Sequence, residues 1–533
     1  MLAWIQLWMA LARLNRVRSP YFRTICRAVL MISGSLVPSL IRRTIHATVV
    51  FRPRSPLIFP RYSILPGMGL NLTLGVDGIS VALLFLTAFI YLTAIFTSWT
   101  IHKREKEFFL FMALLVTGVF GVFISLDLFL FFLFYELAVL PMYLLIGIWG
   151  STKEIPGKGP FAWTYEQIRV GVKEYGAMKL TLYLLVGSAF ILVALFRVYV
   201  ESGASLGHPT FDFLQLQRAT FDPGVARLLF LLFYVGFGVL AGIWPLHTWS
   251  PDGHAAAPAA GSMMHAGVLM KLGAYGVLRV GFGLFPSAAH ELAWIVGTIA
   301  AINILYGALA AGWQRDIKYL IAYSSVSHMG IVMLGMATLN EPGIAGSVFQ
   351  MVSHGIMTGL LFTIVNLVYH KSHTRDMTEM GGFAHRMPVL ATFFALAGFT
   401  SLGLPGLSGF VAEFLVFLGA WTSAHPWWLI PGVLGAFITA IYVLRAFRWI
   451  FLGPENPHHP DLPDARGTEV LSMVILGAIL ILLGLYPRLL LDAIHTGVVE
   501  FLAHLGGAGC CNGPPFRWNW GSWPWPWCFS CWI

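Results

Sequence analysis

Twelve long apolar runs follow one another along most of the chain, with short loops between them. About 20 apolar residues suffice to cross the hydrocarbon core of a bilayer as a helix. Lipid offers no partner to an open backbone, so each crossing segment should be helical. We therefore predict an all-α polytopic membrane protein with about 12–14 transmembrane helices. The runs cover roughly residues 79–99, 108–125, 128–149, 175–199, 225–246, 255–280, 289–312, 317–338, 343–368, 389–424, 427–451 and 468–488.

Composition supports the same fold class. Hydrophobic residues make up 57% of the chain and charged residues 11%, whereas soluble domains carry about 25% charged residues. So little charge excludes a soluble enzyme, a nucleic-acid binder and a disordered protein. We expect the chain to lie in a lipid bilayer and not to bind nucleic acid.

Two of the runs are interrupted in ways that suggest broken helices. The run 389–424 is too long for one plain span and contains Gly403-Leu404-Pro405-Gly406. The run 225–246 ends at Trp244-Pro245 and continues into a polar stretch, 247–254. We expect breaks near 240–254 and 403–408, and such pairs of broken helices often mark ion or substrate sites in transporters.

The two ends of the chain differ from the membrane domain expected over residues 77–490. Residues 1–76 contain ten arginines and no Asp, Glu or Lys, so they account for the net charge of +9. This segment is typical of a mitochondrial presequence; the alternatives are two weak membrane helices, at 1–12 and 24–41, or a wrongly chosen start codon. Residues 491–533 end in a Trp/Pro/Cys-rich tail, whose single C-x-x-C (Cys528 and Cys531) lacks the second half of a zinc site.

Lysine and arginine are distributed unequally between alternate loops. Most of them follow the odd-numbered runs when 389–424 is counted as one span. By the positive-inside rule, those loops are expected on the cytoplasmic or matrix side and the C-terminus on the outer side.

Several ionisable residues are predicted to lie within the membrane. Glu136 and Lys271 fall in the middle of predicted spans, and Glu413 follows the second break. A charge at the centre of a span costs about 2.5–3.5 kcal/mol, so such residues usually have a partner, a water cavity or a function. The other candidates are three histidines inside apolar runs and a lysine near the start of one, namely His265, His328, His354 and Lys179.

Each candidate also has a structural alternative. Glu136 and Lys271 could form structural ion pairs, a lone intramembrane histidine often only joins two helices, and Lys179 could extend to the interface. The remaining charges are interpreted as structural: Lys318 and Arg315 as loop charges, and His247, Asp252 and His254 as surface residues that cap the first break.

The chemistry that fits these residue types is proton movement. Carboxylate, amine and imidazole groups each bind and release protons when burial and neighbours adjust their affinity. The sequence shows no dinucleotide-binding glycine motif and no cysteine set for an iron–sulfur cluster. A metal site from His328 and His354 lacks an acidic ligand nearby in sequence, so we expect no metal or cofactor site in this chain.

Five motifs point to a known family. They are WPLHTWSPDGH at 244–254, AYSSVSHMG at 322–330, HTRDM at 373–377, GLPGLSGFVAEF at 403–414 and YGAMK at 175–179. Together they resemble the antiporter-like membrane subunits of respiratory complex I, the NADH:quinone oxidoreductase. The resemblance runs from about Gly75 to Pro487 and is strongest to the subunit M group, equivalent to mitochondrial NADH dehydrogenase subunit 4.

The resemblance implies a fourteen-helix subunit with two inverted five-helix repeats, each with a broken helix. It gives Glu136 the place of the fifth-helix acid, Lys271 that of the central eighth-helix lysine, and Glu413 that of the exit-side carrier; His328 and His354 match polar residues between them. It further implies that quinone reduction elsewhere in the complex drives proton transfer through this subunit. NADH, FMN, iron–sulfur clusters and quinone would be bound by other subunits, and the partners would be other membrane-arm subunits, including neighbouring antiporter-like ones.

One position departs from the family. The family usually carries a lysine in the broken seventh helix, paired with the fifth-helix glutamate, and here that position is Leu240. We hypothesise that Lys179, or Lys271 through water, replaces the missing cation. The alternative is an impaired first half of the relay.

Four functions compete at this stage. The first is a proton-translocating subunit of complex I in a bacterial cell membrane or a mitochondrial inner membrane. The second and third are a subunit of a multi-subunit sodium/proton antiporter and the membrane subunit of an energy-converting hydrogenase. The fourth is a structural scaffold that has lost pumping. This hypothesis is retained because Leu240 stands where the family usually has a lysine.

Overall fold

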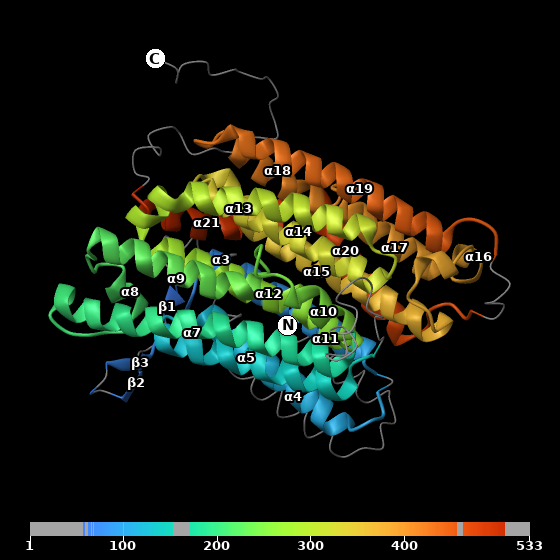
Figure 1. Ribbon diagram of the computed structural model, residues 1–533, viewed down its shortest axis with the longest axis horizontal. Helices are drawn as coiled ribbons and strands as arrows, with labels where there is room; N and C mark the ends of the chain where they lie inside the picture. The colour runs from blue at the N-terminus through green and yellow to red at the C-terminus, as the bar shows by residue number, and fades with distance from the viewer. Residues whose placement is uncertain are drawn as a thin grey trace, which may run out of the picture.

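Long helices that lie side by side dominate the computed structural model (Figure 1). It describes residues 57–58, 62–65, 67, 69–99, 101–152, 171–455 and 462–506. The helices expected at 1–12 and 24–41 and the C-x-x-C of the tail lie outside the described residues.

Ten of the described helices are long and apolar enough to cross a membrane, as the apolar runs predict. One of these crossing segments, Pro426–Phe451, joins the short helix η5 (Pro426–Trp428) to α19. The helices are α3 (Gly78–Thr97), α4 (Glu105–Ile124), α5 (Leu128–Trp149), α7 (Lys173–Leu206), α9 (Pro223–Ala241), α13 (Pro286–Trp313), α14 (Ile317–Ala337), α15 (Glu341–Ser372), α19 (Leu429–Phe451) and α20 (Thr468–Leu485).

Two further predicted spans are built from shorter pieces. The run predicted at 255–280 is a continuous helix with two π-helical stretches: α11 (Ala259–Met264), η2 (His265–Leu269), α12 (Met270–Gly276) and η3 (Val277–Phe282). The run predicted at 389–424 is two helices, α17 (Pro388–Ser401) and α18 (Ser408–Trp421). The second predicted break is therefore confirmed.

The first break is confirmed as well, between α9 and α10 (Trp249–Ala256). Gly242 ends α9 with φ +75°, a left-handed conformation that glycine adopts at little cost. Pro245 follows, and proline has no N–H to continue a helix. At the second break Gly403 and Gly406 have φ +73° and +95° around Pro405.

The two broken helices lie at the same place in two five-crossing units. In both α4 to η3 and α13 to α19, the fourth crossing is the broken one. α4 follows Lys103 and Arg104, whereas α13 starts at the other end of the bundle, after Phe285. The units are thus inverted repeats. We call the end with Lys103, Arg104 and Arg386 the basic end, and the end with loops 125–127, 207–222 and 283–285 the far end.

Helices α14 and α15 form the centre of the molecule. Figure 1 shows both helices in the middle of the bundle. In each, 94% of the most apolar 18-residue stretch is buried. Close approach relies on small residues: a Cβ on Gly307 of α13 would lie 2.6 Å from the backbone of Ser327 in α14. Side chains on α14 and α15 are therefore removed from lipid.

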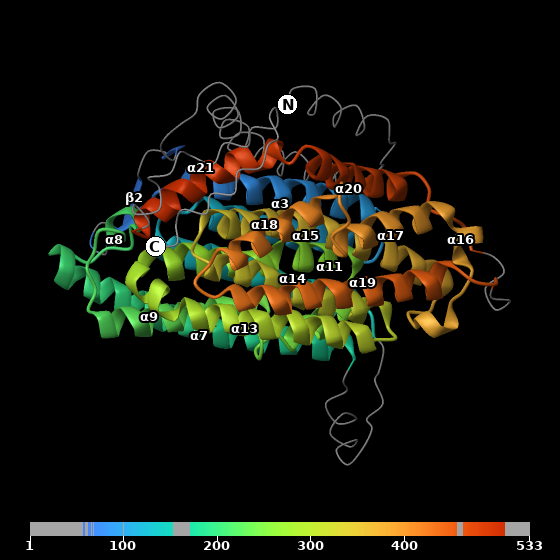
Figure 2. The ribbon, with the colours of Figure 1, turned by 90° about the horizontal axis from the view of Figure 1, so that it is seen from above.

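Small elements cover the two ends of the bundle. Residues 57–76 contain two antiparallel strand pairs, β1 (Leu57–Ile58) with β4 (Gly75–Val76) and β2 (Tyr62–Leu65) with β3 (Leu70–Leu72). No strands were predicted there. In Figure 2, β2 and α8 (Phe213–Leu216) lie at the far end and α16 (Phe383–Arg386) at the basic end. The short helix η4 (Met377–Glu379) precedes α16, and α21 (Arg488–His504) continues from α20 alongside α3.

Candidate functional site

Lys271 lies at the centre of the bundle with no exposed surface. Its ammonium donates to the carbonyl oxygen of Ala266 and lies 2.6 Å from Nδ1 of His354. Lys271 is flanked by the two π-helical stretches, and π-helical turns often occur at functional sites. A lysine proton and an imidazole lone pair are thus in direct contact. Because Lys271 has no exposed surface, this contact is shielded from bulk water.

His328 continues the line from His354 towards the second repeat. The two imidazole rings lie 5.2 Å apart. Nδ1 of His328 is 3.1 Å from the Gln350 amide nitrogen and 3.6 Å from Oε1 of Glu413, and Nε2 is 3.1 Å from the Ser401 hydroxyl. The neutral ring accepts from Gln350, whereas a proton on Nδ1 would face the carboxylate of Glu413.

Glu413 completes this line on α18, five residues after the helix starts at the second break. Glu413 is 5% exposed. Gly403 faces it, since a Cβ on that glycine would lie 2.7 Å from Oε2 of Glu413. The break therefore makes room for the carboxylate.

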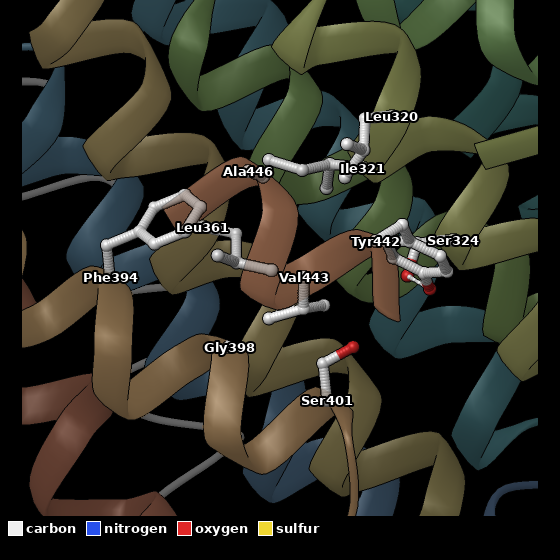
Figure 3. A pocket seen from close by; sticks show the side chains of 10 residues that line it. All are labelled: Leu320, Ile321, Ser324, Leu361, Phe394, Gly398, Ser401, Tyr442, Val443 and Ala446. Carbon is white, nitrogen blue, oxygen red and sulfur yellow. Dashed lines mark hydrogen bonds between the residues drawn. The ribbon is translucent and has the colours of Figure 1, made fainter. Parts of the chain in front are cut away.

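A small cavity of about 10 Å³ adjoins this line, close to the lower limit for holding one water molecule. Ser324, Ser401 and Tyr442 bring their hydroxyls to one side of it (Figure 3). Tyr442 donates to Ser324 across 2.7 Å, and Ser401 is the hydroxyl partner of His328.

His254 and His247 correct the sequence interpretation. Both were expected at the surface, but they are 0% and 2% exposed. The ring of His254 lies 5.5 Å from Phe362 of α15, and the ring of His247 lies 4.8 Å from Tyr306 of α13. The ring of His254 lies 4.2 Å from that of His265. Among the described residues, neither ring nitrogen of either histidine has a hydrogen-bond partner. His265 was predicted as a relay residue, whereas its neighbour His254 was interpreted only as a surface cap of the first break.

Lys179 does not pair with Glu136, contrary to our first hypothesis. Its ammonium lies 2.6 Å from Oδ2 of Asp252, and the Tyr319 hydroxyl donates to Oδ1 across 2.9 Å. Asp252 is thus the acceptor for two side chains rather than a simple surface cap. This cluster sits where α7, α10 and α14 meet.

Glu136 is half-buried and accepts a hydrogen bond from Ser188. Within the described part of the chain, no cation lies within ion-pairing distance of its carboxylate. Leu240, at the position of the family's lysine, is fully buried.

Lys318 was predicted to be a loop charge, but the structure buries it. It is 2% exposed and donates to the Ala257 carbonyl, just past the end of α10. Arg375 of the HTRDM motif donates to the Ala255 carbonyl and pairs with Asp316 at 3.2 Å. Both cations satisfy carbonyls at a helix C-terminus, where positive charge is favourable. Arg315 is exposed, as expected.

Together, the inverted repeats, the two broken helices and the buried Lys–His–His–Glu line define an antiporter-like membrane subunit. A family model described as NADH:quinone oxidoreductase/Mrp antiporter, TM, matches residues 168–439. The chain belongs to this family.

Similar proteins agree with the resemblance to subunit M. The NADH-quinone oxidoreductase subunit M of Rhodobacter capsulatus is 38% identical over 82% of this chain and 83% of its own. The subunit M of Rickettsia prowazekii is 37% identical over 83% of this chain and 86% of its own.

Solved structures extend the likeness to the fold. A chain of respiratory complex I from Thermus thermophilus with bound NADH has a TM-score of 0.75 at 27% identity, covering 86% of this chain and 92% of that one. The Mrp complex from Dietzia sp. DQ12-45-1b has a TM-score of 0.75 at 20% identity, covering 91% and 94%; this second likeness concerns the fold alone.

Proposed function

We propose that this chain is a proton-translocating membrane-arm subunit of an NADH:quinone oxidoreductase in an energy-coupling membrane. The observation that carries the proposal is the buried line from Lys271 through His354 and His328 to Glu413. NADH, FMN, iron–sulfur clusters and quinone belong to other subunits in this proposal. Neighbouring antiporter-like subunits are its partners in the membrane arm.

The geometry supports a stepwise transfer. A proton on Lys271 passes to Nδ1 of His354 across 2.6 Å. It then moves between the two imidazoles, whose rings lie 5.2 Å apart, and from His328 to Glu413 across 3.6 Å. Each acceptor binds one proton and gives one up, so the line returns to its starting state after each transfer.

The first repeat supplies the central lysine in this proposal. His265 and His254 lie just before Lys271 along the chain and form a second buried pair. Lys179 and Asp252 hold the end of the broken helix nearby, and Glu136 is half-buried on α5 and accepts a hydrogen bond from Ser188 of α7. We assign these groups to the input half of the relay.

The sodium/proton antiporter remains the alternative, because the Mrp complex shares the fold. The relatives at 37% and 38% identity are both named as subunits of quinone oxidoreductases. That naming favours the redox-driven complex.

The test is NADH-driven proton uptake into sealed vesicles that hold the assembled complex. We expect Lys271→Met and Glu413→Gln each to assemble and to lose most of the proton uptake and the coupled NADH oxidation. Glu291→Gln serves as the control, since its side chain is 54% exposed and pairs with the exposed Arg227. If both variants take up the same number of protons per NADH oxidised as the parent, the chain is a structural scaffold.

A further inference from the structure

A second polar cavity lies at the far end of the bundle, away from the Lys271–Glu413 line. Its volume is about 260 Å³, enough for several water molecules. Its walls come from β4, the starts of α3 and α5, the residues that follow α4, and parts of α8, α12, η3 and α21. The side chains that matter here are Asp77, Ser80, Tyr275, Arg279, Glu500 and His504.

An ion pair stands inside this cavity. Asp77 caps α3 by accepting from the Ser80 amide at 2.9 Å, and its other oxygen accepts from Arg279 of η3. The two side chains are 12% and 19% exposed. Arg279 also lies over the ring of Tyr275, at 5.3 Å. Charged groups at this depth are far less costly when water reaches them.

The inner wall of the cavity is made of hydroxyls and aromatic rings. The Tyr275 hydroxyl lies 2.8 Å from that of Ser80, and both residues are buried. Phe123 packs edge-on and Phe131 face-on against the Tyr275 ring, at 5.1 and 6.1 Å. The rings separate the cavity from the core, and the two hydroxyls form its polar contact with the core.

Tyr275 also links the cavity to the relay, because it follows Lys271 by four residues within α12. Residues at that spacing lie on one face of a helix, about 5–6 Å apart at Cβ. Lysine has a flexible four-carbon side chain. Lys271 faces Ala266 and His354 in this structure, so a link to Tyr275 requires the lysine side chain to rotate away from them.

We propose that this cavity is a hydrated proton vestibule on the outer face, and that it gives Lys271 a second, minor outlet besides Glu413, which carries most of the protons. The proposal rests on the proposed function. A proton from Lys271 adds to the Tyr275 oxygen while the Tyr275 proton passes to Ser80, and the Ser80 proton passes to water. No bond other than O–H and N–H changes, and the hydroxyls are restored when the proton leaves. The Asp77–Arg279 pair holds α3 against η3 around this mouth.

Water access is tested first, by cysteine labelling of the full complex. The native cysteines Cys26, Cys510, Cys511, Cys528 and Cys531 are replaced by serine, and Ser80→Cys is introduced. We expect a cationic, membrane-impermeant methanethiosulfonate to modify it from the outer side only. Ser262→Cys is the control, because Ser262 is fully buried away from the cavity. Gln217→Cys at the cavity wall replaces Ser80→Cys if that variant does not assemble. No modification of the cavity cysteine would overturn the proposal.

Proton conduction is tested second, in the vesicle assay. We expect Tyr275→Phe to lower the number of protons taken up per NADH oxidised. Tyr234→Phe is the matched control, a buried tyrosine outside the cavity wall. An unchanged proton ratio in Tyr275→Phe would reduce the cavity to a water pocket and overturn the outlet. If Lys271→Met also pumps normally, the proposed function itself fails.

Discussion

At the scale of single residues, the surroundings of Glu136 differ most from those that its family resemblance implies. Its described partner is the hydroxyl of Ser188, not a lysine. Lys179, the substitute hypothesised from the sequence, pairs instead with Asp252. A carboxylate with one neutral donor is less stabilised as an anion than one beside a cation. Among the described residues, no cation therefore replaces the family's lysine beside Glu136.

Restoring the family's lysine tests whether the site still accepts a pair. Leu240→Lys buries an ammonium where the leucine has no exposed surface, which is costly unless a carboxylate compensates. We expect Leu240→Lys to destabilise the complex less in the parent than in a Glu136→Gln background, with a coupling energy of about 1 kcal/mol or more. Thermal unfolding of the four variants measures it. Equal losses in both backgrounds would show that position 240 does not reach Glu136.

At the scale of elements, the break between α17 and α18 shows how a backbone feature places a chemical group. Gly403 holds φ +73° beside the Glu413 carboxylate. A Cβ there meets both a conformational penalty, about 1–2 kcal/mol for a left-handed residue, and the carboxylate itself. The glycine is thus tied to the position of the carboxylate as well as to the geometry of the break.

We expect Gly403→Ala to lower both the stability of the complex and its proton uptake, because Glu413 has to move. Gly312→Ala in α13 is the control, since a methyl group at that position would have no neighbour within 4 Å and the φ of Gly312 is ordinary. That change should be neutral or stabilising by up to about 1 kcal/mol. Equal proton uptake in the two alanine variants would contradict the role of Gly403.

Helix α21 is attached at the far end partly through His495. Its Nε2 lies 2.9 Å from the Glu341 carboxylate at the start of α15. This hydrogen bond raises the pKa of His495 above its usual value. A raised pKa means that the contact stabilises fully below the unfolded pKa of about 6.5 and is lost as pH rises through the folded pKa.

We therefore expect His495→Gln to destabilise the complex most at acidic pH and to match the parent at alkaline pH. Both side chains are more than a third exposed, at 44% and 37%, so the difference should stay below about 1 kcal/mol. Thermal unfolding of parent and variant from acidic to alkaline pH measures this stability difference. His385→Gln at the basic end is the control. A stability difference between parent and His495→Gln that grows as pH rises would contradict this prediction.

At the scale of the whole molecule, the loop charges and the inverted repeats together give an orientation. The basic end collects Lys103, Arg104, Arg315 and Arg386, and α10 ends there under Lys318 and Arg375. By the positive-inside rule this end faces the cytoplasm or matrix. The far end, with α21 and the second cavity, then faces outward.

This orientation can be checked with two exposed positions in the background without native cysteines. Ala424→Cys lies in the loop before η5 at the far end, and His385→Cys lies in α16 at the basic end. We expect an impermeant maleimide to label Ala424→Cys from outside in intact cells or mitoplasts, and His385→Cys only after the membrane is permeabilised. The reverse pattern would invert the topology, and with it the direction assigned to both outlets.

Sequence alone determined the membrane class, the places of both helix breaks, and the choice of Lys271, His328, His354 and Glu413 as candidates. Apolar run length, Gly–Pro punctuation and the cost of a charge in lipid are local properties, and they can be read without a fold. The surroundings of His254, Asp252 and Lys318 were decided only by the tertiary structure. A polar stretch such as 247–254 suits a surface loop equally well, until α7, α13 and α14 pack against it and bury most of it. Partners such as Lys179 and Asp252 are far apart in sequence, so which charges meet depends on how distant helices pack.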